Sequence, residues 1–223
     1  MNRQLQFLPT LGVLLLLAAP FINAQDKKGK GDKDPGGADN YYPLEVGNKW
    51  TFNVAVAGNS VTAISSIVKI EMINGKSMAR LEAAIKDKVV ANEHLRQTEE
   101  GIFRHRNNGQ DIDPSICLLK YPVKAGAKWQ GEFKVGNDDG KYSCESSEES
   151  IEVPAGKFKA IRVNIRLESK GQNVNTAYWF VKDIGFVKQT VDAGGLNIVM
   201  ELEKFERAKP APNKDKTPKP APK

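Results

Sequence analysis

The sequence contains the phrase YPLEVGNKW at residues 42–50 and a second version of it, YPVKAGAKW, at residues 121–129. Five of the nine positions are identical, and the shared Trp is among the rarest residues, so chance is a poor explanation. Later segments repeat at nearly the same spacing, residues 70–80 as residues 151–162 and residues 101–104 as residues 185–188. We therefore predict two related halves, about 41–115 and 120–205.

Apolar residues recur at every second position inside each half, which is the period of a half-buried β-strand. Residues 50–56 and 161–167 show this period, and Asn74-Gly75 is typical of a type I′ hairpin turn. Residues 81–100 are rich in helix formers, but the corresponding residues 167–180 contain Ser-Lys-Gly-Gln-Asn, so both are predicted as strand, turn, strand. We predict an all-β, antiparallel, internally duplicated fold of about 10–12 strands, in a curved half-barrel or a sandwich.

Three segments flank the predicted β domain, residues 41–206. Residues 1–24 combine Arg3, a short apolar run and a small residue at Ala24, the pattern of a secretory signal peptide. The apolar run is too short to cross a bilayer as a helix, so no transmembrane anchor is predicted in the mature chain. Residues 25–40 and the Lys/Pro/Ala tail, residues 207–223, have too few apolar residues to offset the entropy of ordering and are predicted to be disordered. The protein is predicted to be exported, either to the periplasm or outside the cell.

The net charge of +6 comes almost entirely from the tail. Residues 207–223 contribute +5 and the predicted signal peptide +1, which leaves the rest of the chain neutral. A neutral β domain has no basic surface for a phosphate backbone, so nucleic acid is not an expected partner. The tail is the segment expected to attract an anionic cell-surface polymer.

The two cysteines, Cys117 and Cys144, are the only pair in the chain, and an oxidising compartment favours a disulfide between them. Free buried thiols are the alternative. A redox-active pair is not expected, because the two residues are not in a Cys-x-x-Cys spacing.

No catalytic or metal-binding pattern is recognisable. His94 and His105 are the only histidines and have no zinc-site spacing, and no Gly-x-Ser-x-Gly motif occurs. The pair Asp111 and Asp113 is explained by turn formation rather than by calcium binding. We therefore predict no enzyme, no catalytic residue, no metal and no cofactor.

Aromatic residues near strand ends have two interpretations. Trp50, Trp129, Trp179 and Tyr178 either line an apolar cavity for a ligand, as in small barrels, or pack within the core. The sequence alone leaves both open.

Three phrases together resemble a widespread group of uncharacterised exported bacterial β-proteins. They are YYPLxxGNKWT at residues 41–51, VPAGxF at residues 153–158 and YWFxxxxGxVK at residues 178–188. The resemblance implies an antiparallel β fold similar to the curved sheets of bacterial lipoprotein carriers. It carries no activity that could be placed on particular residues.

These observations lead to three hypotheses about function. The first is an exported, non-catalytic structural or protein-interaction module of the cell envelope. The second is a carrier of a lipid or another apolar ligand, which needs an enclosed apolar cavity. The third is a hydrolase whose carboxylates come together from distant strands, which needs two acidic side chains facing each other in a cleft.

Overall fold

The computed structural model describes residues 40–209, which form twelve β-strands. In chain order these are β1 (Lys49–Val56), β2 (Asn59–Ile73), β3 (Lys76–Ile85), β4 (Lys88–Thr98), β5 (Gly101–Asn107), β6 (Gln110–Lys120), β7 (Lys128–Val135), β8 (Asp138–Val153), β9 (Gly156–Ser169), β10 (Gln172–Val181), β11 (Gly185–Ala193) and β12 (Leu196–Glu206). The predicted signal peptide and most of the two segments predicted to be disordered lie outside the described residues. Within the described range, no helix has the length and apolar character that crossing a membrane requires.

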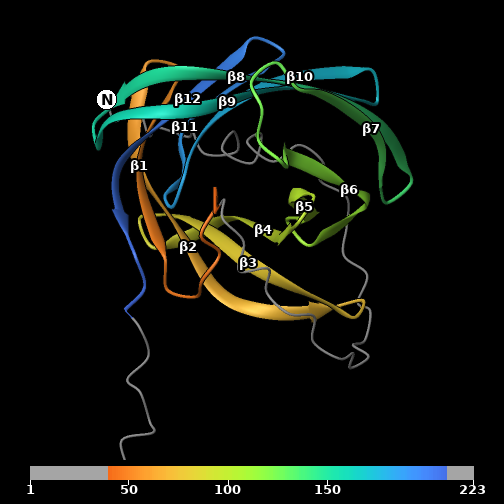
Figure 1. Cartoon of the computed structure of the whole chain (residues 1–223), viewed down its shortest axis with the longest axis horizontal. Coiled ribbons are helices and arrows are strands. Elements are labelled where there is room, and N and C mark those ends of the chain that lie inside the picture. The colour runs from red at the N-terminus through yellow and green to blue at the C-terminus, as the bar shows by residue number, and fades with distance from the viewer. Residues whose placement is uncertain (1–39, 210–223) are drawn as a thin grey trace, which may run out of the picture.

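The strands form one closed barrel in which each strand pairs antiparallel with its neighbours in sequence (Figure 1). The last strand closes onto the first through eight residue pairs between β1 and β12. The all-β antiparallel prediction and the predicted number of strands are confirmed. The predicted half-barrel or sandwich is replaced by a closed barrel, because the β1–β12 ladder leaves the sheet without the two free edges of a half-barrel.

The twelve strands fall into two sets of six, β1–β6 and β7–β12, with the repeated phrases at matching places. Residues 42–50 lead into β1, and residues 121–129 lead into β7. Asn74-Gly75 joins β2 to β3 with φ angles of 50° and 75°, which suit a type I′ turn. Residues 81–100 form the end of β3, a turn and β4, so the predicted strand, turn and strand are confirmed against helix propensity.

Aromatic rings fill the middle of the barrel. The rings of Phe52 and Phe186 stack with centroids 4.9 Å apart. Tyr42, from the segment before β1, is 3% exposed and packs edge-on against Phe186 and Trp50, at 5.9 and 5.4 Å. A twelve-stranded barrel has room for side chains or ligands inside, and here these rings occupy much of that room.

The ladder between β6 and β7 is short. It comprises two residue pairs and ends at Asp113. Beyond that point side chains of β7 and β8 take over the pairing, since the backbone N–H of Cys117 donates to the Tyr142 hydroxyl at 3.3 Å and its carbonyl accepts from Trp129 Nε1 at 2.9 Å. The barrel is therefore closed at this seam by side chains rather than by a continuous ladder.

Two glycines make room for the aromatic side chains at this seam. A Cβ atom at Gly131 would lie 2.7 Å from the ring of Tyr142, and one at Gly140 would overlap the ring of Phe133. Both rings thus lie flat on the inner surface of β7 and β8, where a larger residue would push them away.

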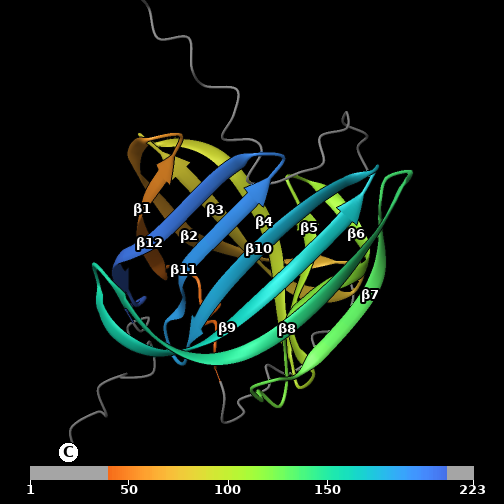
Figure 2. The same cartoon turned by 90° about the horizontal axis from the view of Figure 1, so that it is seen from above.

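Strands β7–β12 form a curved sheet that is seen face-on in Figure 2. Its strands β8 and β9 are 16 and 14 residues long and bend strongly along their length (Figure 2). Hollows lie on the outer face of this sheet and in the interior of the barrel, and two more, of about 490 and 510 Å³, lie around the ends of β7, β8 and β9.

Candidate functional site

An ion pair lies inside the barrel. Glu93 on β4 and Arg104 on β5 have side chains that are 16% and 13% exposed. Arg104 donates from Nε and Nη2 to the two carboxylate oxygens, at 2.9 and 3.1 Å. Burial alone would lower the pKa of Arg104, but the adjacent carboxylate outweighs it, and the net direction of the pKa is upward. Arg104 is therefore held in its charged form beside the carboxylate.

Hydrogen bonds continue from this pair to the opposite wall. Arg104 Nη2 donates to the Tyr178 hydroxyl at 3.0 Å, and Gln189 Nε2 donates to the same oxygen at 2.8 Å. Tyr178 is 4% exposed, and burial raises its pKa above the ordinary value. The network joins β4 and β5 to β10 and β11 across the lumen and holds the Arg104 side chain in one orientation.

A cavity of about 50 Å³ adjoins the network. Its wall combines Tyr42 and Arg104 with the apolar side chains of Leu81, Phe186 and Met200. One water needs roughly 10–15 Å³ of such space, whereas pockets for small ligands measure roughly 300–1,000 Å³. This cavity has room for a few waters and is far smaller than a lipid-binding pocket.

The four aromatic residues predicted as a ligand lining do not share one cavity. Tyr178 lines the cavity in the lumen. Trp50 is 1% exposed and donates from Nε1 to a backbone carbonyl, and Trp129 does the same at the β6–β7 seam. Trp179 lies on the outer face of β10, beneath a guanidinium group. A ligand-lining role for these residues stays a prediction.

The predicted disulfide needs correction. Cys117 and Cys144 are both buried, and both are free thiols. The Sγ atom of Cys144 lies 3.9 Å from the backbone carbonyl oxygen of Cys117, so the side chain approaches the backbone of β6 rather than the other sulfur. Burial raises the pKa of the Cys117 thiol to about 12 and also raises that of Cys144, so neither forms the reactive thiolate.

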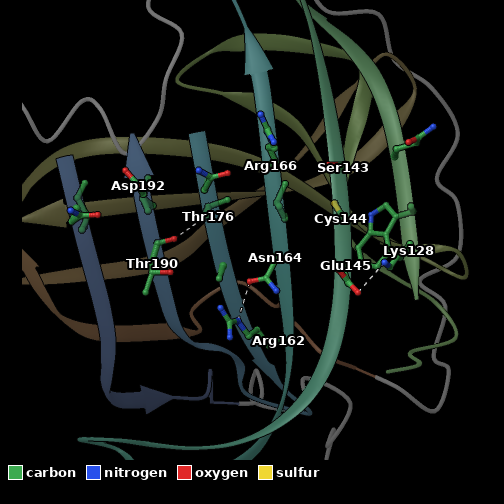
Figure 3. Close-up of a pocket in the computed structure, with 18 of the residues that line it drawn as sticks. Lys128, Ser143, Cys144, Glu145, Arg162, Asn164, Arg166, Thr176, Thr190 and Asp192 are labelled. Atoms are coloured by element: carbon green, nitrogen blue, oxygen red, sulfur yellow. Dashed lines mark hydrogen bonds and ion pairs between the residues drawn. The ribbon is translucent and has the colours of Figure 1, made fainter. Parts of the chain in front are cut away.

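An open trough of about 910 Å³ lies on the outer face of the β7–β12 sheet (Figure 3). Two rows of outward side chains line it, and each row takes one residue from each of the six strands. The first row is Gln130, Ser143, Arg166, Asn175, Asp192 and Asn197. The second row, two residues away along each strand, is Lys128, Glu145, Asn164, Ala177, Thr190 and Val199. The trough therefore runs across the strands.

Small side chains form the floor of the trough and long ones stand at its border. Ala177 faces outward and is nevertheless only 5% exposed, because its neighbours shelter it. At the border, Trp179 is 6% exposed and lies under the Arg162 guanidinium, 5.0 Å from the ring centroid, and the Lys188 ammonium, 5.7 Å away. These cations cover the ring and fix the border on this side.

The charges of the trough nearly balance. Lys128 Nζ lies 3.2 Å from the Glu145 carboxylate (Figure 3). Arg162 Nε donates to Asn164 Oδ1 at 3.0 Å. In the first row a cationic and an anionic side chain stand on either side of Asn175. Chemically the trough presents planar amides, hydroxyls and charges of both signs, all solvated on one side.

Neither the cavity in the lumen nor the trough brings two carboxylates together. Among the described residues that line the cavity in the lumen, Glu93 is the single acidic one. In the trough, Glu145 and Asp192 come from β8 and β11, which are three strand spacings or roughly 14 Å apart. Paired catalytic carboxylates of glycosidases are roughly 5–9.5 Å apart. No group of three or more His, Cys, Asp or Glu side chains within residues 40–209 is arranged to hold a metal ion.

No protein-family model and no curated protein matches the chain. Among solved structures it is similar to a protein named "putative lipoprotein" from Parabacteroides distasonis, with 14% identity, a TM-score of 0.47 and coverage of 76% of this chain and 100% of that one. A "putative exported protein" with a YmcC-like fold from Bacteroides fragilis has 14% identity, a TM-score of 0.45 and the same coverage. The hypothetical lipoprotein YmcC from Escherichia coli has 10% identity and a TM-score of 0.38, covering 75% of this chain and 86% of that one. Likenesses of this strength assign neither a family nor a function.

Proposed function

We propose that the protein is an exported, non-catalytic binding module of the cell envelope, and that the outer trough is its docking surface. The observation that carries the proposal is the contrast between the two hollows. The lumen holds a cavity of about 50 Å³, whereas the trough offers about 910 Å³ on an open face. A partner of macromolecular size reaches the trough without any change in the barrel.

Several features support a non-catalytic role. The buried thiols have raised pKa values, the buried Glu93 is already paired with Arg104, and the acidic residues of the trough are too far apart to act as a pair. Enzymes use nucleophiles and bases with pKa values tuned to the working pH, placed in a shared cleft. The described residues offer a surface with fixed polar groups instead.

The docking role is tested by co-sedimentation of the mature protein with isolated envelope fractions. Arg166→Ala and Asn175→Ala remove two side chains of the first row, and Asn173→Ala is the matched control. Asn173 is exposed on the same strand and the same face as Asn175, two residues away and outside the trough. We expect the two trough variants to sediment at least tenfold less, and the control to behave like the wild type. Equal sedimentation of all variants would refute docking through the trough.

The basic tail is proposed as a second, electrostatic contact with an anionic cell-surface polymer. Arg207 Nη2 donates to the Asp183 carbonyl at 2.9 Å and the Ala208 N–H to Asn48 Oδ1 at 2.7 Å, so the first tail residues belong to the barrel. The informative deletion is therefore residues 210–223. Its effect should shrink as salt is raised, because exposed charges are screened. Association that is unchanged by the deletion at low salt would contradict this role.

A carrier of an apolar ligand would need a larger cavity in the lumen. An apolar ligand of ordinary size needs several times the present cavity, and Tyr42 and Phe186 would have to leave the centre of the barrel to provide it. Native mass spectrometry of protein purified from its natural compartment tests this directly. A bound apolar molecule that is lost on denaturation would favour the carrier over the docking module.

A further inference from the structure

We propose that the ligand of the trough is an uncharged glycan strand lying across strands β7–β12. This inference rests on the proposed docking function and adds the chemical class of the partner.

The side chains of the two rows match a ligand rich in hydroxyl and amide groups. Half of the twelve are uncharged and polar, namely Gln130, Ser143, Asn164, Asn175, Thr190 and Asn197. Each amide offers both a donor and an acceptor, and each hydroxyl offers the same pair, so vicinal hydroxyls of a sugar can be bonded in either direction. Because the groups on β8–β12 stand on strands that are paired on both sides, their spacing is fixed before the ligand arrives.

The electrostatics favour an uncharged ligand over a polyanion. Of the five charged residues that line the trough, three are cationic and two are anionic. Lys128 is neutralised by Glu145 at 3.2 Å, and Arg162 is 3.6 Å from Glu149. A polyanion would meet the Asp192 carboxylate directly, and like charges across an interface are unfavourable.

The apolar surface of the barrel lies elsewhere, which argues against a protein partner in the trough. The exposed large hydrophobic residues among residues 40–209 are Val46, Ile64, Val68, Ile70 and Val89, all in the first half of the chain. Protein interfaces depend on buried aromatic or aliphatic anchors at their centre. The centre of the trough holds Ala177 and Thr190 instead, and the adjacent Trp179 ring is covered by cations.

The dimensions suit a linear oligosaccharide. Six strands at roughly 4.8 Å spacing give the trough a length of roughly 24 Å, and two residues along a strand separate the rows by roughly 7 Å. That is a channel about one sugar ring wide and several rings long. Polar groups repeat at each strand, so successive sugars meet hydrogen-bonding side chains on both sides.

The test is calorimetric titration of the mature protein with three hexasaccharides: cellohexaose, fully N-acetylated chitohexaose and the polyanionic hexagalacturonate. We expect saturable binding of at least one uncharged hexasaccharide that is insensitive to salt. Arg166→Ala and Asn175→Ala should each weaken it at least tenfold, and Asn173→Ala should leave it within twofold of the wild type. Circular dichroism of each variant shows that the barrel is intact.

Three results would overturn the inference, and they separate it from the docking function. Binding of hexagalacturonate alone would make the ligand a polyanion. Binding unaffected by Arg166→Ala and Asn175→Ala would place the glycan outside the trough. If both variants abolish envelope association while no hexasaccharide binds and protease treatment of the envelope removes the partner, the docking function stands and the glycan is wrong. The docking function itself is refuted by a different result, namely envelope association that both variants leave intact.

Discussion

Replacing Arg104 with methionine should destabilise the barrel by about 3 kcal/mol at pH 7, because it leaves the Glu93 carboxyl inside the barrel without a cation. Breaking a buried ion pair in this way costs roughly 3–5 kcal/mol. The carboxyl can escape part of this cost by taking up a proton. Protonating an ordinary glutamate at pH 7 costs roughly 3.7 kcal/mol, from 1.36 kcal/mol per pH unit above a pKa of about 4.3. The side chains of Glu93 and Arg104 are 16% and 13% exposed, so some solvation remains and the lower end of the range applies.

The same reasoning fixes how the effect changes with pH. At pH 5 protonation costs only about 1 kcal/mol, so the destabilisation caused by Arg104→Met should shrink to about that value. The double variant Glu93→Leu/Arg104→Met removes both charges and should lie within about 1 kcal/mol of the wild type. Arg162→Met is the matched control on the outer face. Arg162 is 38% exposed and 3.6 Å from Glu149, a surface pair expected to be worth less than about 1 kcal/mol.

Urea unfolding followed by tryptophan fluorescence measures these free energies, and Trp50, Trp129 and Trp179 are all buried and therefore report on unfolding. The slope of the free energy with urea should stay constant across the variants. A loss below 1 kcal/mol for Arg104→Met at pH 7, or a double variant as unstable as the single one, would refute the view that the pair is a buried, coupled unit.

Three further predictions follow from local contacts. Unfolding without reductant should release two titratable thiols per chain from Cys117 and Cys144, whereas none would mean that a disulfide forms after all. Gly140→Ala should cost roughly 1–3 kcal/mol by displacing the ring of Phe133, and a second change, Phe133→Leu, should restore part of it, both measured by urea unfolding. Burial, and to a smaller extent nearby cations, lowers the pKa of His105 in the folded protein from 6.5 to about 4. As the pH falls, the unfolded chain therefore takes up a proton at a higher pH than the folded protein does. Stability should therefore drop by about 1–2 kcal/mol between pH 6.5 and 4, after allowance for solvent screening, and His105→Gln should flatten this slope.

Local patterns in the sequence were enough to predict the strands. The period of two over residues 50–56 and the Asn74-Gly75 turn are signals within a few residues, and they predict β1 and the β2–β3 hairpin as found. The comparison of the two halves also gave the right interpretation of residues 81–100, where propensity favours a helix. Closure of the barrel depends on contacts between β1 and β12, which are separated by the whole domain. No local pattern contains that information.

The candidate sites needed the register of the strands. In the sequence, Glu93 and Arg104 look like ordinary charged residues of a polar region. Each lies two residues from a fully buried side chain, Leu95 or Ile102, and only this spacing along the strand indicates that they point inward. The rows of the trough become visible only when six strands are aligned. Asn175, for instance, stands beside Arg166 and Asp192 through pairing alone. The disulfide prediction failed for a related reason, because redox compartment and spacing do not fix which way a cysteine side chain points.

The two seams between the six-stranded sets differ, although similar phrases of sequence lead into β1 and β7. Both seams join the end of one set to the beginning of the other, yet β12 and β1 share eight residue pairs and β6 and β7 share two. Pro114 follows directly after the last paired residue of β6 and has no N–H to donate, and β12 contains no proline. Side chains from β7 and β8 then satisfy the backbone of Cys117 in place of a ladder. As a result the backbone of β7 is paired along most of its length with β8 alone. The end of the trough at Lys128 and Gln130 is therefore its most adaptable part, while the end on β12 is fixed by the closed seam.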